Sequence, residues 1–161
     1  MIKFKIIILS VLLTVFVTAA AGQNPKMPGE KDRCPVCAMF VHPYPKWIAE
    51  MIYEDGAIKF FDGPKDMFKY FLHPEKYGGS ADQKPVKIYV REYYELQWVQ
   101  ADSAYFVIDS DILGPMGNEL VPLKSKKDAE EFKEDHQGGK IIKFNEVTWD
   151  LLMRLSVGQE M

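Results

Sequence analysis

Four side chains that can bind metal ions or react with oxidants lie within nine residues near the start of the chain. Cys34 and Cys37, the two cysteines of the sequence, are followed by Met39 and His42. Thiolate and thioether sulfurs are preferred ligands of Cu(I), and thiolates with imidazoles bind Zn(II). A C-x-x-C pair also occurs in disulfides and in thiol oxidoreductases. The segment therefore predicts a disulfide, a redox pair, a zinc site or a copper site.

The first two alternatives fit the local sequence poorly. A disulfide between Cys34 and Cys37 would close a very short loop and would add little stability. A catalytic thiol pair uses a helix N-terminus to lower the thiol pKa. Pro43 and Pro45 leave little room for a helix after Cys37, and no strand pattern precedes the pair.

Zinc and copper differ in the ligands that they require. Structural zinc takes four ligands, and beyond His42 the chain offers only His73 and His136, both close to the ends of predicted helices. Cu(I) takes fewer ligands and favours sulfur. Cys37 and Met39 are two residues apart, so in an extended segment both would face the same ion. Met116, in a predicted loop over residues 109–118, is the candidate third ligand.

The elements that must position these residues follow from periodicity and turn signals. Residues 47–53 and 57–61 are expected to form a hairpin around Asp55-Gly56, and a helix is expected from Asp62, as its cap, to His73. Further strands are expected over 86–90, 92–101, 103–108, 119–123 and 140–144, and further helices after Ser125 and over 147–155.

The order of these elements is the same in both halves of the chain. Each half runs strand, turn, strand, helix, strand, and similar segments recur about 60 residues apart. We therefore predict an α+β fold of two similar ββαβ halves, residues 33–92 and 93–161, packed together and followed by a C-terminal helix. Residues 22–32, polar with two prolines, are expected to be a flexible leader.

The first 21 residues have the pattern of a secretory signal peptide. Lys3 and Lys5 precede an apolar run, and small residues end at Ala21. No cysteine follows them, so a lipid-anchored form is not expected. Removing this segment leaves 18 basic and 23 acidic side chains, a net charge of −5. An acidic chain without a basic cluster argues against nucleic acid as a partner.

Three ordered motifs resemble the NosL family of exported copper-binding accessory proteins. They are Cys34-Pro-Val-Cys-Ala-Met-Phe-Val41, Phe61-Asp-Gly-Pro-Lys-Asp-Met-Phe68 and Ser110-Asp-Ile-Leu-Gly-Pro-Met-Gly-Asn-Glu-Leu120. The resemblance extends over about residues 33–144. It implies two ββαβ halves, in agreement with the repeat.

The resemblance also implies a function. The family binds Cu(I) and delivers it to the copper-sulfide centre of nitrous oxide reductase, so we expect a periplasmic copper chaperone and not an enzyme. Its Cys-x-Met element falls on Cys37 and Met39, and its Met-Gly-His-Glu element begins at Met116. Cys34 and His42 are candidate additional ligands or, for Cys34, a redox partner. We expect one Cu(I) per chain or per homodimer, with nitrous oxide reductase or its maturation machinery as partner.

The chain departs from the family pattern at two positions. Asn118 stands where the family has a histidine, which implies different or weaker copper binding. Ala38 stands where the family has glycine. This implies that the turn does not require a positive φ. The alternative function is a thiol-disulfide oxidoreductase that uses Cys34 and Cys37.

Overall fold

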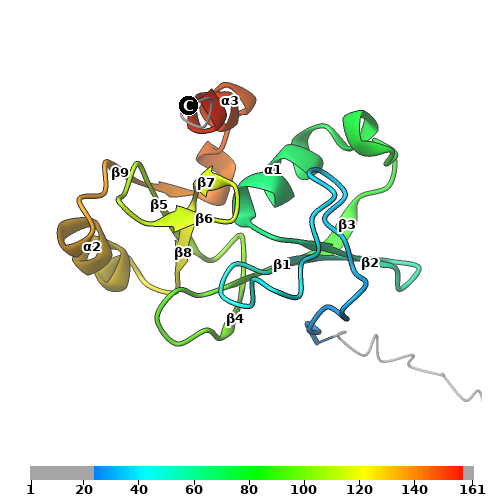
Figure 1. Cartoon of the computed structure of the whole chain (residues 1–161), viewed down its shortest axis with the longest axis horizontal. Coiled ribbons are helices and arrows are strands. Elements are labelled where there is room, and N and C mark those ends of the chain that lie inside the picture. Colours follow the sequence, from blue (N-terminus) through cyan, green and yellow to red (C-terminus); the bar gives the residue numbers. More distant parts are fainter. Residues whose placement is uncertain (1–23, 158–161) are drawn as a thin grey trace, which may run out of the picture.

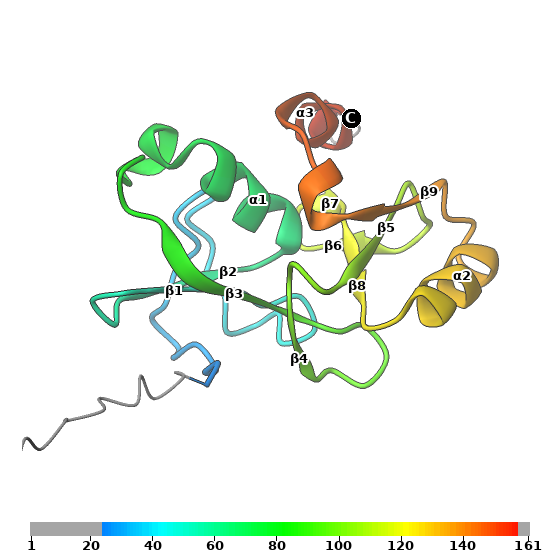
Figure 2. The same ribbon diagram turned by 180° about the vertical axis from the view of Figure 1, so that it is seen from behind.

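The structure is a computed structural model that describes residues 24–157, so the predicted signal peptide over residues 1–21 lies outside the described residues. Two antiparallel sheets lie side by side, with α1 and α3 on one side of them and α2 at the outer end (Figure 1). The view from behind shows the same arrangement (Figure 2). In the part of the chain from 24 to 157, no helix combines the length and apolar character needed to cross a membrane.

The first sheet has the strand order β2-β1-β3-β4. It is formed by β1 (Ala49–Tyr53), β2 (Ile58–Phe61), β3 (Pro85–Arg91) and β4 (Trp98–Gln100), with α1 (Pro64–Leu72) and the short 3₁₀ helix η1 (Pro74–Tyr77) between β2 and β3. The Asp55-Gly56 turn joins β1 to β2 as predicted, and Gly56 supplies the positive φ of 83° that the turn requires.

The second sheet repeats this topology with the order β8-β5-β9. It is formed by β5 (Tyr105–Ile108), β8 (Val121–Leu123) and β9 (Lys140–Lys143), with α2 (Lys126–Asp135) before β9. In both sheets the opening strand is central and is flanked by the second and third strands. The 3₁₀ helix η2 (Phe144–Glu146) and α3 (Trp149–Val157) follow. The predicted α+β fold with two ββαβ halves and a C-terminal helix is confirmed.

A two-stranded ribbon interrupts the second half. β6 (Leu113–Gly114) and β7 (Gly117–Asn118) pair with each other, and Pro115-Met116 is the turn between them. The loop predicted over residues 109–118 therefore carries Met116 at the tip of a short hairpin. Both ribbon views show this hairpin beside the start of α1 (Figures 1 and 2).

The strand predicted over residues 92–101 is wrong in its first half. The buried Glu92 carboxylate accepts hydrogen bonds from the backbone N–H groups of Tyr94 (3.1 Å) and Glu95 (2.7 Å). These bonds fold the segment into a turn, and only β4 remains extended. Because β4 pairs with β3, the first sheet continues past residue 92.

The two helix starts differ from each other. At α2 the Ser125 hydroxyl accepts from the N–H of Asp128 at 3.1 Å, as the sequence predicts. At α1 the N-cap is Gly63 and makes no side-chain cap, so the prediction that Asp62 caps this helix is wrong. The Asp62 carboxylate is directed to a thiol instead.

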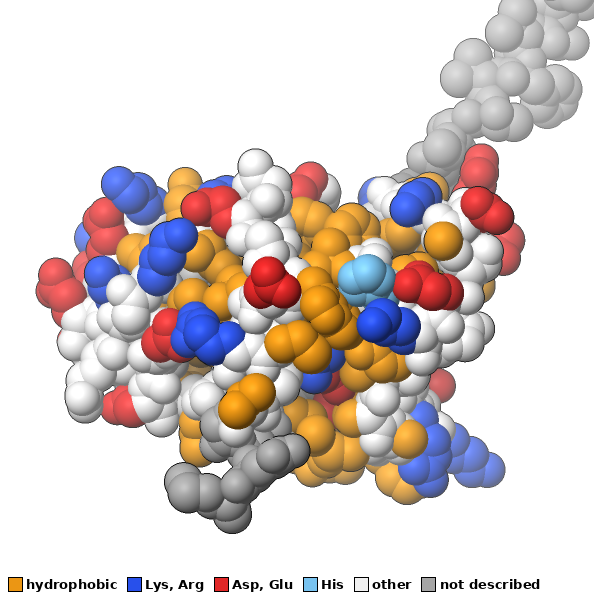
Figure 3. Space-filling model, turned by 90° about the horizontal axis from the view of Figure 1, so that it is seen from above, with side chains coloured by type: hydrophobic (Ala, Val, Ile, Leu, Met, Phe, Trp, Pro, Cys, Tyr) orange, Lys and Arg blue, Asp and Glu red, His pale blue; other side chains and the backbone are white. Residues whose placement is uncertain are grey.

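Aromatic side chains join the halves in one core. The Phe68 ring of α1 lies 5.2 Å from that of Phe106 in β5 and 4.9 Å from that of Phe144, measured between centroids. Hydrophobic side chains are also visible in the middle of the face seen from above, with charged groups between and around them (Figure 3). The segment 24–32, expected to be flexible, contacts the first sheet through the Lys26 N–H, which donates to Glu50 at 2.7 Å.

Candidate metal site

The segment that carries both cysteines is a tight loop. Arg33 and Phe40 form an antiparallel bridge at its base. Inside it the Cys34 N–H donates to the Met39 carbonyl, and the Ala38 N–H donates to the Cys34 carbonyl, both at 2.9 Å. The expectation that Cys37 and Met39 share an extended segment is therefore wrong, because the chain turns through residues 35–37.

The turn requires a left-handed residue at its end. Ala38 has φ = 63°, so the expectation that alanine marks a turn without positive φ is wrong. The hydrogen bond from the Ala38 N–H to the Cys34 carbonyl, four residues earlier, is of the type that ends many helices. This type of turn needs a residue in the left-handed conformation at its end. Glycine would adopt it with less strain.

Cys37 and Met39 nevertheless lie at the same surface hollow. Both are half-buried, and both line an open hollow at the surface of the loop. The lining residues are Arg33, Cys37, Ala38, Met39, Phe40, Pro43 and Tyr44. A thiol and a thioether therefore border one hollow that solvent and a metal ion can enter.

Behind the loop, the two thiols lie close to two carboxylates, that of Asp66 in α1 and that of Asp62 just before α1. Cys37 Sγ lies 3.3 and 3.4 Å from the two oxygens of Asp62, and Cys34 Sγ lies 3.6 Å from Oδ2 of Asp66. One ligand atom from each of these residues falls within 4.8 Å of the other three. We call Cys34, Cys37, Asp62 and Asp66 the thiol–carboxylate cluster.

The cluster keeps Cys34 protonated in the absence of a cation. Its hydrogen bond with Cys37, its burial and the charges of Asp62 and Asp66 all raise the pKa of the Cys34 thiol far above its usual range. Burial also raises the pKa of Asp62. Lys69 Nζ, 3.2 Å from Asp66 Oδ1, is the ammonium paired with a cluster carboxylate. A bound cation would relieve the repulsion in this cluster.

Met116 belongs to the second half and is tied to α1 through its backbone. Its carbonyl oxygen accepts a hydrogen bond from Lys65 Nζ at 2.5 Å, and the Asn118 carbonyl accepts from the same ammonium at 2.7 Å. The described lining of the Cys37–Met39 hollow does not include Met116. The structure thus brings Met116 to the segment that carries Asp62 and Asp66.

His42 points elsewhere. It is exposed, and its Nδ1 lies 3.4 Å from the Pro28 carbonyl. It does not belong to the thiol–carboxylate cluster. Among the candidate additional ligands, the structure places Cys34 with Cys37 and leaves His42 outside.

Sequence reasoning missed Asp62 and Asp66 as members of this site. The sequence pattern predicts a helix cap at Asp62 and indicates no role for Asp66. Their spacing of four residues, which puts two carboxylates at one helix start, was the available signal. Nothing local indicated that the face toward which they point holds the cysteine loop.

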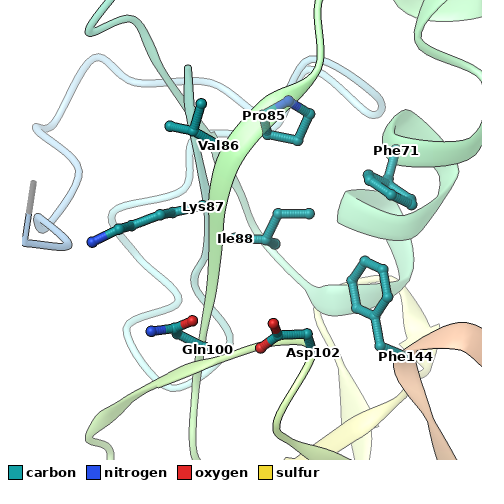
Figure 4. A pocket seen from close by; sticks show the side chains of 8 residues that line it. All are labelled: Phe71, Pro85, Val86, Lys87, Ile88, Gln100, Asp102 and Phe144. Carbon is teal, nitrogen blue, oxygen red and sulfur yellow. The ribbon is translucent and has the colours of Figure 1, made fainter. Parts of the chain in front are cut away.

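A second hollow lies away from these groups, where α1, β3 and η2 meet. Phe71, Ile88 and Phe144 point into it, and Asp102 lies at its edge (Figure 4). The residues that line it include neither sulfur nor imidazole ligands. The sulfur ligands predicted from the sequence therefore lie at the cysteine loop and not at this hollow.

Comparison with known proteins agrees with the motifs. The chain is 28% identical over 131 residues to the copper-binding lipoprotein NosL of Stutzerimonas stutzeri, and the match covers 76% of this chain and 65% of that protein. It also matches the crystal structure of the copper chaperone NosL from Shewanella denitrificans with a TM-score of 0.67 and 26% identity, over 80% of this chain and 97% of that one. The family model described as NosL matches residues 25–152, so the chain belongs to the NosL family.

Proposed function

We propose that this chain is an exported copper(I) chaperone that supplies copper for the copper-sulfide centre of nitrous oxide reductase. The observation that carries the proposal is the convergence of Cys34 and Cys37 with two carboxylates beside the hollow that Met39 lines, in a chain of the NosL family. The relatives named above are a copper-binding lipoprotein and a copper chaperone. Their names support a role in carrying copper and not in catalysis.

The donor set suits Cu(I). We assign Cys37 as the main thiolate, Met39 and Met116 as thioethers, and Cys34 as a second thiolate once its proton has left. Soft sulfur ligands favour Cu(I) over harder divalent ions. Asp62 and Asp66 are hard ligands, and we assign them a charge role: they hold negative charge next to the thiols and favour cation entry.

An open site favours transfer over storage. The hollow beside Cys37 and Met39 is accessible at the surface, so ligands of a recipient protein can approach the ion before it leaves. Export fits this role, and we propose that the reductase receives its copper in the periplasm. The signal peptide expected over residues 1–21 and the lipoprotein named among the relatives support export.

The rival function is a thiol-disulfide oxidoreductase, and the geometry disfavours it. The C-x-x-C pair lies in a turn and not at a helix N-terminus, and Cys34 is buried with a raised thiol pKa. A catalytic thiol pair requires a lowered pKa and an accessible attacking sulfur. We expect no reduction of insulin disulfides by the reduced chain, and turnover of insulin would favour the rival function.

Complementation tests the proposed delivery. In a nitrous-oxide-respiring strain that lacks its own NosL-family protein, the chain should restore the copper-sulfide centre of the reductase, measured by its visible absorption. Cys37→Ser should fail to restore it, and Met153→Leu, in helix α3 and outside the proposed ligand set, should restore it fully. Equal restoration by Cys37→Ser would contradict delivery through this site.

A further inference from the structure

Lys65, in the first turn of α1, is a buried lysine that holds the opposite half of the molecule. Its side chain is 1% exposed, and its ammonium donates to the carbonyls of Met116 (2.5 Å) and Asn118 (2.7 Å). Lysine is rarely buried, because removing an ammonium from water is costly unless it is paired. The cost of burying the Lys65 ammonium is therefore offset only while these two carbonyls stay in place.

Glu119 makes the reciprocal connection from the second half to the first. Its Oε1 accepts the Lys65 N–H at 2.6 Å and the Leu120 N–H at 2.9 Å. The Lys65 N–H is one of the donors that a helix start leaves without an internal partner, so Glu119 caps α1 from the other half of the chain. Burial raises the pKa of Glu119 to about 8 and lowers that of Lys65.

Two glycines leave room for this carboxylate. A Cβ atom on Gly63 would lie 2.3 Å from Glu119 Oε2, and one on Gly114 would lie 3.1 Å from the same oxygen. Gly63 has an ordinary extended φ of −167°, so glycine is required there for space and not for conformation. One glycine comes from each half, which shows that the halves close around the Glu119 side chain.

The hairpin that carries Met116 depends on these contacts for its position. β6 and β7 have two residues each, and such a short ribbon has little stability of its own. Lys65 binds the carbonyl of Met116, in the turn of this hairpin, and that of Asn118, beside the turn. Asp62 of the thiol–carboxylate cluster lies three residues before Lys65. The distance between the Met116 turn and the cysteine loop is therefore set through α1.

We propose that Lys65 and Glu119 form a latch that positions Met116 toward the copper ion held by the cysteine loop. The inference rests on the proposed function, in which Met116 is a copper ligand. Lys65 and Glu119 act as positioning residues: they touch the Met116 turn and the start of α1, and they are assigned no contact with copper.

A double-mutant cycle separates positioning from general stability. Lys65→Met keeps the length and apolar body of the side chain and removes its three donors. In the reduced exported chain (residues 22–161), Cu(I) competition against a chromophoric chelator should show a loss of roughly 10–100-fold in affinity for Lys65→Met, as for other residues that orient metal ligands. In a Met116→Ala background the same substitution should change the affinity by less than about twofold, because the ligand it positions is absent.

Each other outcome overturns a defined part of the account. If Met116→Ala weakens copper binding and Lys65→Met lowers affinity equally in both backgrounds, the latch is overturned while the ligand assignment stands. If Met116→Ala alone leaves the affinity unchanged, Met116 is not a ligand, and both the proposed ligand set and the latch fail.

Two further variants keep the test decisive if Lys65→Met does not fold, which circular dichroism would show. Gly114→Ala places a methyl group 3.1 Å from Glu119 without changing the cysteine loop, and its loss of Cu(I) affinity should also disappear in the Met116→Ala background. Persistence of that loss would overturn the latch. Lys65→Arg, which keeps donors for the two carbonyls, should retain more affinity than Lys65→Met, and the reverse order would contradict the proposal.

Discussion

The thiol of Cys37 lies 3.3 Å from Oδ1 of Asp62, 25 residues further along the chain. This contact joins the cysteine loop to the start of α1, where Asp66 makes the corresponding approach to Cys34. A thiolate beside a buried carboxylate is unfavourable until a cation arrives. The site is therefore stabilised by its cargo, and several of its residues should trade stability of the free protein for affinity.

Asp62→Asn should stabilise the copper-free protein and weaken copper binding. Burial raises the pKa of Asp62 above its ordinary value of 3.8, so the protonated form is favoured by folding. The stability that protonated Asp62 contributes is fully present below pH 3.8. It is lost as the pH rises through the pKa that Asp62 has in the folded protein. At pH 7.5 the ionised carboxylate thus costs stability, and urea unfolding should show a gain on the order of 1 kcal/mol in the variant.

The matched control is Asp82→Asn, in an exposed loop, which should change neither the stability of the copper-free protein nor its Cu(I) affinity. The gain from Asp62→Asn should shrink as the pH falls through the raised pKa of the wild-type carboxyl group. A variant that is less stable at pH 7.5, or that binds Cu(I) as tightly as the wild type, would show that Asp62 has a structural role only.

Copper affinity should rise steeply with pH. Contact with Cys37, burial and two nearby carboxylates raise the pKa of Cys34, so its thiol carries a proton at neutral pH that copper must displace. Each displaced proton contributes about a tenfold change in affinity per pH unit. Between pH 6.5 and 8, the slope of log affinity against pH should be smaller by about one in Cys34→Ala than in the wild type. Equal slopes would remove Cys34 from the ligand set.

Asn118→His should tighten Cu(I) binding by about tenfold, because imidazole is a copper ligand and the carboxamide is not. Asn118 is half-buried in β7 next to the Met116 turn, and only its backbone carbonyl is held by Lys65, so the exchange leaves the latch in place. Competition titration measures the change, with Asn118→Gln as the control that adds no imidazole. Unchanged or weaker binding in Asn118→His would show that position 118 is remote from the ion.

Ala38→Gly should stabilise the protein by about 0.5–1 kcal/mol. The left-handed φ of 63° costs an alanine about 1–2 kcal/mol, and the greater freedom of glycine in the unfolded chain offsets part of that gain. Urea unfolding of the reduced protein measures the change. Ala38→Val, whose branched side chain fits the left-handed region worse, should lower stability, and the opposite order of the two variants would contradict the strain assigned to this turn.

The sequence predicted most of the fold because the governing signals are local. Asp55-Gly56 indicated the first hairpin, Ser125 the start of α2, and the repeated strand and helix patterns the two ββαβ halves. The failures have two causes. Asp62 has the pattern of a helix cap, but its carboxylate contacts Cys37, which lies 25 residues earlier in the chain. Glu92 has the pattern of a strand residue, but its carboxylate accepts hydrogen bonds from the nearby N–H groups of Tyr94 and Glu95, and periodicity does not reveal this local turn.

The candidate site shows the same division between local signals and contacts that are distant in the sequence. Residue type and spacing indicated Cys37, Met39 and Cys34 as a sulfur-rich group. The Lys65–Glu119 latch spans 54 residues, and only packing of the two halves reveals that these charged residues are buried together. A motif can therefore name the donors of a metal site, while the residues that orient them emerge from the tertiary structure.

The most direct test of the central claim is an anaerobic Cu(I) titration of reduced residues 22–161 against a chromophoric chelator. We predict about one tightly bound ion per chain or per homodimer, with a loss of at least about 100-fold in affinity for Cys37→Ser and none for Met153→Leu. A Cys37→Ser protein that keeps the full Cu(I) affinity of the wild type would contradict the assignment of this loop as the copper site.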